Sequence, residues 1–394
     1  MLNDNANDII YLDHNATTPV DPEVKAHMRP FLEGEYGNPS SGYALGVSAK
    51  EALESARGDV ADLLNCEKEE VIFTSGGSES NNTALKGLID FRTPARSHVI
   101  TSAVEHPAVL NPLLFLMELG VRVTILPVDG KGRVDPDDVR KALSPDTTLV
   151  TIMLANNETG TIQPIETISQ ITRDRGVLLH TDAAQAVGKI EVDVRRLGVD
   201  LLSVAGHKLY APKGVGALYV RKGVDLNPLI HGAGQEMNKR AGTENVMYAT
   251  GLGTACRVAK KRRHRDLKEI KAMRDRLEAY LFEHVDDLVL NGHPGYRLPN
   301  TLNVSVPHVE GGRILSELPG LMASTGAACH DRTVKLSHVL SAMGVPPEIG
   351  MGALRFSVGR SNAMAQMEVA GQWITDQIRK IRQSQPKGRH DGEA

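Results

Sequence analysis

An aspartate and a lysine that follow apolar, strand-like runs are the first candidates for chemistry. Asp182 comes directly after VLLHT, where a carboxylate is costly to bury unless a cation pairs with it. A protonated pyridine nitrogen would be such a cation; the alternative is that Asp182 caps the next helix. Lys208 lies in a glycine-rich loop after LLSVA, and a lysine with a lowered pKa can form a Schiff base with an aldehyde. Lys213 is its rival, and the alternative for either is a solvent-exposed lysine.

A glycine-rich turn could bind an anion. The stretch FTSGGSESNN leads from an apolar run through Gly76, Gly77 and Ser78 into a helical pattern. Glycines let backbone N–H groups approach a phosphate closely, and the N-terminus of a helix favours a negative charge. The alternative is an ordinary strand-to-helix turn in which Ser78 is the N-cap.

One of the three cysteines lies directly before a histidine. Cys329 is part of ASTGAACHDR, a loop rich in small residues, and His330 follows it. A thiol beside a base or a cation can ionise to a nucleophilic thiolate. The alternative is a buried, unreactive cysteine, which is what we expect of Cys66 and Cys256. An odd number of cysteines indicates a reducing compartment rather than a disulfide framework.

Seven short apolar runs are expected to position these residues. They begin near residues 71, 98, 121, 148, 177, 201 and 216, are rich in Val, Ile and Leu, and several are separated by helical patterns. This pattern predicts an α/β fold with a mostly parallel, seven-stranded sheet flanked by helices. In such sheets ligands bind beyond the carboxyl ends of the strands, which is where Asp182 and Lys208 fall.

The sequence changes character near residue 250. Residues 254–285 read as one long amphipathic helix, and its KKRRHR run is interpreted as a solvated face because acidic residues follow it. A smaller α+β unit opens at RLPNTLNVSV and ends in the helical pattern EVAGQWITDQIRKIRQ. We therefore expect a large domain at 16–250, a small domain that combines 1–15 with 251–384, and a flexible tail at 385–394.

Composition argues against several classes of protein. With 45 Lys plus Arg against 48 Asp plus Glu, the net charge is −3, unlike the basic excess of a nucleic-acid binder. The sequence has no uncharged apolar run of about 18 residues, so we expect no membrane span. The acidic start, MLNDNANDII, is unlike a signal peptide, which indicates a cytoplasmic protein. A dinucleotide site is disfavoured because GLGTAC follows no clear strand.

Taken in order, the motifs resemble those of NifS/IscS-type cysteine desulfurases and their relatives, the selenocysteine lyases. The shared stretches cover nearly the whole chain and include YLDHNATTPVD, FTSGGSESNN, HTDAAQAVGKI, GHKLYAPKGVGALY, RAGTENV and ALRFSVGR. The resemblance implies a fold-type I enzyme that binds pyridoxal 5′-phosphate (PLP) and forms a homodimer. It also implies that L-cysteine or L-selenocysteine loses sulfur or selenium to leave L-alanine. No metal site is expected.

The resemblance further implies roles for individual residues around PLP. Lys208 is expected to hold the cofactor as a Schiff base, and Asp182 to pair with the ring nitrogen. His106 is expected to stack on the ring and assist proton transfer. Gln185 and Asn157 are expected to contact the phenolic oxygen of the cofactor or the substrate. Four residues are expected to bind the phosphate, the last of them reaching across to the other subunit: Gly77, Ser78, His207 and Thr243.

Four further residues are expected to act on the substrate. Arg355 would hold the substrate carboxylate through a two-pronged contact, and Asn15 and Ala16 belong to a segment that closes over the substrate. Cys329 would act on the sulfur or selenium. An aminotransferase or another PLP lyase would not need this thiol, and a non-catalytic scaffold would not be expected to keep these reactive residues.

Three departures from the desulfurase pattern bear on the substrate. Ala205 stands where many desulfurases carry a phosphate-binding serine, Tyr43 follows NPSSG in place of histidine, and TGAACHD replaces SGSACTS. All three are similar to selenocysteine lyases, so the main expectation leans towards a lyase that also acts on cysteine. The alternative is a general cysteine desulfurase that passes sulfur to an acceptor protein for iron–sulfur clusters or tRNA thiolation.

Overall fold

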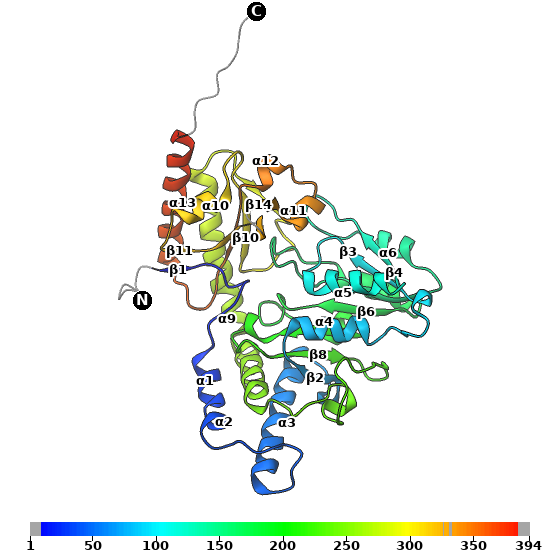
Figure 1. Cartoon of the computed structure of the whole chain (residues 1–394). Helices are drawn as coiled ribbons and strands as arrows, with labels where there is room; N and C mark the ends of the chain where they lie inside the picture. The colour runs from blue at the N-terminus through cyan, green and yellow to red at the C-terminus, as the bar shows by residue number, and fades with distance from the viewer. Residues whose placement is uncertain (1–8, 326, 331–332, 385–394) are drawn as a thin grey trace, which may run out of the picture.

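The computed structural model describes residues 9–325, 327–330 and 333–384 (Figure 1). A seven-stranded sheet forms its larger part, and every strand of it lies at a predicted apolar run. The strand order is β2-β8-β7-β6-β5-β3-β4. The strands are β2 (Val71–Thr74), β3 (His98–Ser102), β4 (Arg122–Leu126), β5 (Thr147–Thr151), β6 (Leu178–Asp182), β7 (Leu201–Ala205) and β8 (Gly216–Val220).

The sheet is mostly parallel, as predicted, because four of its six strand pairings run parallel. The exception is β8, which lies antiparallel to both β2 and β7. All five residues of β7 and of β8 are buried, which explains why these strands read as continuous apolar runs rather than alternating ones. The carboxyl ends of β5, β6 and β7 therefore meet at one edge of the sheet.

Helices cover both faces of this sheet. Val99 and Leu149 pack on one face with α4 and α5, whereas their neighbours Ile100 and Val150 belong to a core on the other face, which α3, α7 and α9 complete. The helices up to α9 are α1 (Pro22–Met28), α2 (Pro30–Glu33), α3 (Ala44–Leu64), α4 (Gly77–Lys86), α5 (Pro107–Glu118), α6 (Pro136–Ala142), α7 (Ile165–Arg173), α8 (Val194–Leu197) and α9 (Val246–His284).

A smaller unit is built on a four-stranded sheet of order β12-β15-β10-β9. Its strands pair antiparallel, and the helices α10 and α13 lie beside it in Figure 1. The elements after α9 are β9 (Val289–Leu290), β10 (Thr301–Ser305), α10 (Gly311–Ser316), β11 (Leu321–Met322), β12 (Ser324–Thr325), β13 (Ala327–His330), β14 (Thr333–Leu336), α11 (His338–Ala342), α12 (Pro347–Gly350), β15 (Ala353–Ser357) and α13 (Met364–Ser384).

The start of the chain joins this smaller unit. Strand β1 (Ile10–Tyr11) pairs in parallel with β11, and Leu12 is buried in the same core as Phe356 of β15. The chain then runs to the edge of the large sheet where β7 ends, since Asn15 and Thr18 bind Lys208 and His207 there. Residues 10–18 therefore lie between the two units and contact both.

One helix, α9, links the two cores. Leu252 packs in the core of the large sheet, whereas Leu277 and Leu281 pack in the core of the small one. The helix begins at Val246, earlier than the predicted residue 254, so the change of character near 250 falls inside it. The proposed domain boundaries stay a prediction, and the tail 385–394 lies outside the described residues.

The basic run of α9 is charge-balanced. Four of the six KKRRHR side chains form ion pairs with acidic residues: Lys260 with Asp62, Arg262 with Asp266, Arg263 with Glu191 and Arg265 with Glu269. Within the part of the chain that the structure describes, no helix is both long and apolar enough to cross a lipid bilayer.

Candidate active site

A cavity of about 370 Å³ lies at the carboxyl ends of β5, β6 and β7. Eleven of the thirteen predicted site residues line it, although they come from both ends of the sequence. These eleven are Asn15, Ala16, Gly77, Ser78, His106, Asn157, Asp182, Gln185, His207, Lys208 and Arg355. The remaining lining residues are Asn81, Ala108, Met153, Ala155, Ala184 and Ala205.

Asp182, the last residue of β6, presents a buried carboxylate to this cavity. Only 6% of its surface is exposed. Asn81 Nδ2 donates a hydrogen bond to Oδ2 at 2.7 Å, and the backbone N–H of Ala184 donates to Oδ1 at 2.9 Å. Both donors are neutral, so within the described part of the chain no cation bonds to Asp182, and its negative charge remains available to a cationic ligand group.

Lys208 ends a single 3-10 turn, Gly206–Lys208, that directly follows β7. Its Nζ donates to the backbone carbonyls of Asn15 (2.5 Å) and Ala16 (2.7 Å). Burial lowers its pKa to about 8, and the positive charge of Arg355 acts in the same direction. Lys208 therefore loses its proton at a lower pH than an ordinary lysine, and the unprotonated amine is a nucleophile.

His106 is the N-cap of α5. Its Nδ1 accepts a hydrogen bond from the backbone N–H of Ala108 at 3.0 Å, which places the ring proton on Nε2. Desolvation lowers the pKa of His106 despite the opposing charge of Asp182. Its neighbour Glu105 is fully buried, and burial raises the pKa of this carboxyl to about 8. His106 is accordingly a neutral imidazole on the cavity wall.

The turn into α4 forms a cradle at the cavity. Gly76 is the N-cap and has a φ of 150° with ψ of −178°, a conformation that is essentially restricted to glycine. A Cβ added to Gly77 would meet Cβ of Ala205 at 3.2 Å, so the two backbones approach closely there. The first N–H groups of α4 and the side chain of Ser78 thus lie beside the cavity, as an anion site requires.

His207 lines the same part of the cavity. Its Nδ1 lies 3.2 Å from Oγ1 of Thr17, and burial together with the charges of Lys208 and Lys213 lowers its pKa to about 4. The ring is therefore neutral, so one of its nitrogens donates a hydrogen bond and the other accepts one. Lys213, the rival of Lys208, does not line the cavity.

Asn15 forms hydrogen bonds with two other residues that line the cavity. Its backbone carbonyl accepts from Gln185 Nε2 at 2.9 Å, and its side-chain Nδ2 donates to the carbonyl of Asn157 at 3.2 Å. Lys189 Nζ donates to Oδ1 of Asn15 (2.9 Å) and to Oε1 of Gln185 (2.5 Å). Burial, Lys208 and Arg355 hold the pKa of Lys189 well below its usual range.

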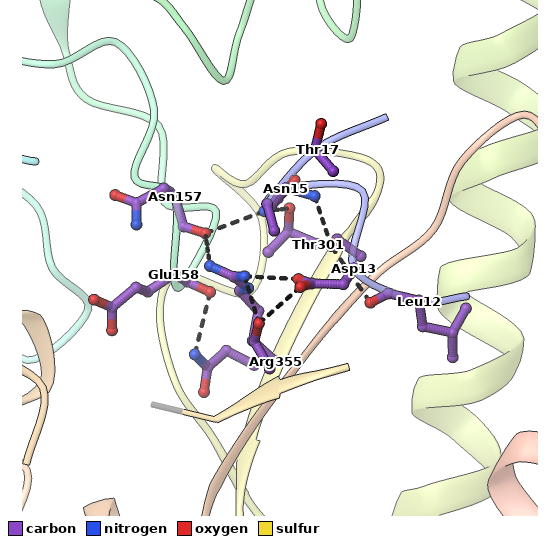
Figure 2. Close-up of polar contacts among 12 residues, drawn as sticks. Leu12, Asp13, Asn15, Thr17, Asn157, Glu158, Thr301 and Arg355 are labelled. Carbon is purple, nitrogen blue, oxygen red and sulfur yellow. Dashed lines mark hydrogen bonds and ion pairs between the residues drawn. The ribbon is translucent and has the colours of Figure 1, made fainter. Parts of the chain in front are cut away.

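Arg355, on β15, joins three segments of the chain (Figure 2). Its Nη2 donates to Oδ1 of Asp13 at 2.7 Å and to Oγ of Ser324 at 2.9 Å, and its Nη1 donates to the carbonyl of Asn157 at 3.2 Å. The hydroxyl of Ser324 in turn donates to Oδ2 of Asp13 at 2.9 Å. A guanidinium is thereby fixed at the edge of the cavity.

The backbone of Cys329 lies in β13, which pairs with β14 as a hairpin; Cys329 is opposite Val334. The side chain of Cys329 lies outside the described residues. Just after β14, Ser337 donates to Oε2 of Glu158 at 2.5 Å, and His338 Nε2 donates to the carbonyl of Glu105 at 2.9 Å. These two contacts anchor the base of the hairpin next to the cavity residues Asn157 and His106.

Some residues that the sequence analysis considered do not line the cavity. Thr243 is exposed and does not line it, and Tyr43 is 60% exposed on the surface. Cys256 is buried, as expected, whereas Cys66 is only half-buried. Burial raises the pKa of the Cys66 thiol to about 12 and that of Cys256 further. Among the described residues, no group of three or more His, Cys, Asp and Glu side chains is arranged to hold a metal ion.

Sequence reasoning missed three residues that shape this site: Asn81, Lys189 and Asp13. Each lies inside a quoted motif, but its partner lies far away in sequence, so the motif alone gave it no role. Asn81 could have been predicted as a site residue. It follows Gly77 by four residues on the same helix, so both residues lie on one helix face.

Comparisons with known proteins agree with this geometry. Residues 10–369 match the family model for aminotransferase class-V. The cysteine desulfurase IscS of Dictyoglomus turgidum is 46% identical over 379 residues, which is 96% of each chain. A solved NifS-like protein superposes with a TM-score of 0.88 at 37% identity, covering 94% of this chain and 100% of its own. A structure of SspA in complex with cysteine has a TM-score of 0.79 at 36% identity and covers 88% and 98%.

The chain belongs to the class-V aminotransferase family. Within it, the chain belongs with the NifS/IscS cysteine desulfurases, and the predicted fold-type I architecture is confirmed. It is therefore a PLP-dependent enzyme. The matches favour the alternative named above, a cysteine desulfurase, over the selenocysteine lyase that the three sequence departures put first.

The groups that line the cavity match the chemical groups of PLP. Asp182 offers a buried carboxylate without a bonded cation, the turn at Gly76 and Gly77 offers backbone N–H groups for a phosphate, and Lys208 offers an amine with a lowered pKa. A pyridine ring, a phosphate and an aldehyde are the three groups that these features would bind.

Proposed function

We propose that the protein is a PLP-dependent cysteine desulfurase that converts L-cysteine to L-alanine and leaves the sulfur on Cys329 as a persulfide. The observation that carries this proposal is the convergence of Asp182, Lys208 and Arg355 on one cavity. Relatives named cysteine desulfurase, and a solved relative titled as a complex with cysteine, support the choice of substrate.

In this proposal the residues of the cavity bind and orient the cofactor. When bound, PLP supplies an electron sink that stabilises negative charge at the substrate Cα. Asp182 pairs with the ring nitrogen and keeps it protonated, since an opposite charge favours the protonated form. His106 would stack on the ring and assist proton transfer, and Gln185 and Asn157 would contact the phenolic oxygen or the substrate. Gly77 and Ser78 at the start of α4, together with His207, would hold the phosphate.

Lys208 would have two tasks here: it would hold the cofactor covalently, and it would move the substrate's α proton. Its pKa near 8 suits both, because the amine can accept a proton near neutral pH and return it. Arg355 binds the substrate carboxylate. Asn15 and Ala16, whose carbonyls contact the amine of Lys208, close over the substrate.

Cys329 receives the sulfur. Its thiolate attacks the sulfur of the bound substrate, the carbon–sulfur bond breaks, and the three-carbon remainder takes up protons and leaves as alanine. The persulfide then passes to a thiol of an acceptor protein, as supply to iron–sulfur clusters or tRNA thiolation would need. The active form is a homodimer in which Thr243 reaches the phosphate in the partner subunit.

Selenocysteine is a second candidate substrate, favoured by one observation at the site. Ala205 lines the cavity at the position where many desulfurases carry a phosphate-binding serine. In this departure the chain is similar to the selenocysteine lyases. Selenolate leaves carbon more readily than thiolate, so a selenocysteine reaction depends less on an attacking thiol. The two functions therefore differ in how much they need Cys329.

Parallel assays of alanine, sulfide and selenide with both amino acids test the proposal. We expect Cys329→Ala to abolish alanine formation from cysteine, with Cys66→Ala as a matched control that retains it. Mass spectrometry after cysteine treatment and alkylation should find one extra sulfur on Cys329. A wild-type enzyme that turns over selenocysteine but not cysteine, and keeps that activity in Cys329→Ala, would establish the lyase instead.

A further inference from the structure

The guanidinium of Arg355 has almost no free capacity for a ligand. Each terminal nitrogen carries two hydrogens. Those of Nη2 are both taken, by Asp13 Oδ1 at 2.7 Å and by Ser324 Oγ at 2.9 Å. One hydrogen of Nη1 goes to the carbonyl of Asn157, and Nε is buried without a hydrogen-bond partner among the described residues.

A carboxylate that binds an arginine through two parallel hydrogen bonds uses one of two edges of the guanidinium. One edge consists of Nη1 and Nη2, and the other of Nε and Nη2. Both edges need a hydrogen of Nη2, and neither can be used while the contacts shown in Figure 2 are intact. A ligand carboxylate must therefore displace Asp13 or Ser324 from Nη2.

We infer that Asp13 occupies the ligand-carboxylate position of Arg355 in the free enzyme and is exchanged for the carboxylate of the incoming amino acid. Asp13 thereby becomes a positioning residue that also sets ligand affinity. The inference deepens the proposed function, since it rests on Arg355 being the carboxylate site of that reaction.

Burial explains why such an occupant is present. The side chain of Arg355 is only 11% exposed and that of Asp13 only 17%. A largely buried cation is unfavourable without an anion, and an exchange of one carboxylate for another keeps Arg355 paired throughout. The hydrogen bond that Ser324 donates to Oδ2 of Asp13 does not involve Arg355 and so does not require the ion pair.

The exchange costs affinity because Asp13 keeps its charge. The displaced carboxylate stays in the same small site as the ligand carboxylate, and like charges at this separation repel. Asp13→Asn keeps the shape and one acceptor but removes both the competing ion pair and the repulsion. We expect the variant to bind an amino acid at least about fivefold more tightly.

The test is a spectral titration of the PLP-loaded enzyme with L-alanine, and with ethylamine, which lacks the carboxylate. Asp13→Asn should lower the dissociation constant for L-alanine and leave that for ethylamine unchanged. Ser324→Ala, which frees one Nη2 hydrogen without changing charge, should give a smaller decrease. Asp59→Asn is the matched control: Asp59 pairs with Arg257 at 2.6 Å, is 20% exposed and lies outside the cavity.

The outcomes separate the inference from the proposed function. Unchanged or weaker L-alanine binding in both Asp13→Asn and Ser324→Ala would overturn the exchange and leave Asp13 only as a support for Arg355. Tighter binding in a protein whose wild type forms no alanine from cysteine would keep the exchange and reject the desulfurase. If Asp13→Asn does not fold, the sign of the Ser324→Ala change decides.

Discussion

At the scale of single residues, the pKa of Lys208 gives a direct test of its role. Burial and Arg355 lower this pKa to about 8, while Asp13 and Asp182 act in the opposite direction. The neutral amine, which attacks an aldehyde, is therefore scarce below pH 8 and predominant above it. We expect the rate at which apoprotein captures PLP to rise between about pH 7 and 9 and then level off. Stopped-flow absorbance at the cofactor band measures this rate.

Two variants check the assignment of Lys208. Arg355→Gln removes a like charge and should move the midpoint of the capture rate to higher pH. Lys208→Ala should remove capture, whereas Lys213→Ala should retain it, and borohydride reduction followed by peptide mapping should find PLP on Lys208. A midpoint near the ordinary lysine value of about 10.4, or cofactor found on Lys213, would contradict the role.

A few site residues could be predicted from the sequence pattern itself, whereas the roles of others, such as His106 and Arg355, came only from the resemblance to a known family. Asp182 and Lys208 follow apolar strands, and Gly77 opens a helix, so their positions at one sheet edge follow from the fold class. Asp13 and Lys189 were not predictable in this way. Their roles arise from partners that only the folded chain brings near, such as Arg355, 342 residues beyond Asp13.

At the scale of elements, the start of α4 depends on the backbone of Gly76. A residue with a Cβ is strained at its φ of 150°, and such strain costs about 1–3 kcal/mol. We expect Gly76→Ala to lower the free energy of unfolding by roughly that amount and to weaken PLP binding, because relief of the strain moves the N–H groups that face the phosphate. Urea denaturation and fluorescence titration with PLP measure the two effects.

Gly58→Ala is the matched control for this prediction. Gly58 lies inside α3 and a Cβ added there meets nothing within 4 Å, so alanine should stabilise the helix by about 0.5–1 kcal/mol and leave PLP binding unchanged. Gly76→Ala with wild-type stability and PLP affinity would show that the turn is not constrained as its conformation implies.

Helices and strands could be predicted where the hydrophobic pattern was long enough to show its period. The seven runs gave all seven strands of the large sheet, and residues 254–285 gave most of α9. The antiparallel direction of β8 was not predictable, since a strand buried on both faces reads the same in either direction. Strands β1 and β11 contain two residues each, too few to show any period, so their pairing was missed as well.

At the scale of the whole molecule, Thr243 raises the question of how many chains build one site. It lies on the surface and outside the cavity of its own chain, although the segment before it is firmly held. Glu236 accepts two hydrogen bonds from Arg57 at 2.7 and 2.9 Å, and Arg240 pairs with Glu79 at 3.0 Å. A fixed, exposed threonine is suited to reach into the site of a partner subunit, as the homodimer proposal requires.

Mixed dimers test this arrangement. Lys208→Ala and Thr243→Asp should each be inactive alone, the second because its carboxylate repels the cofactor phosphate. In a mixed dimer one site combines both defects, but the other combines an intact Lys208 with an intact Thr243 from the other chain. Co-expression should therefore restore up to half of the wild-type activity per mixed dimer. Lys208→Ala with Asp182→Asn should restore none, since both residues line the cavity of one chain. Equal failure of the two mixtures would place Thr243 in its own subunit's site.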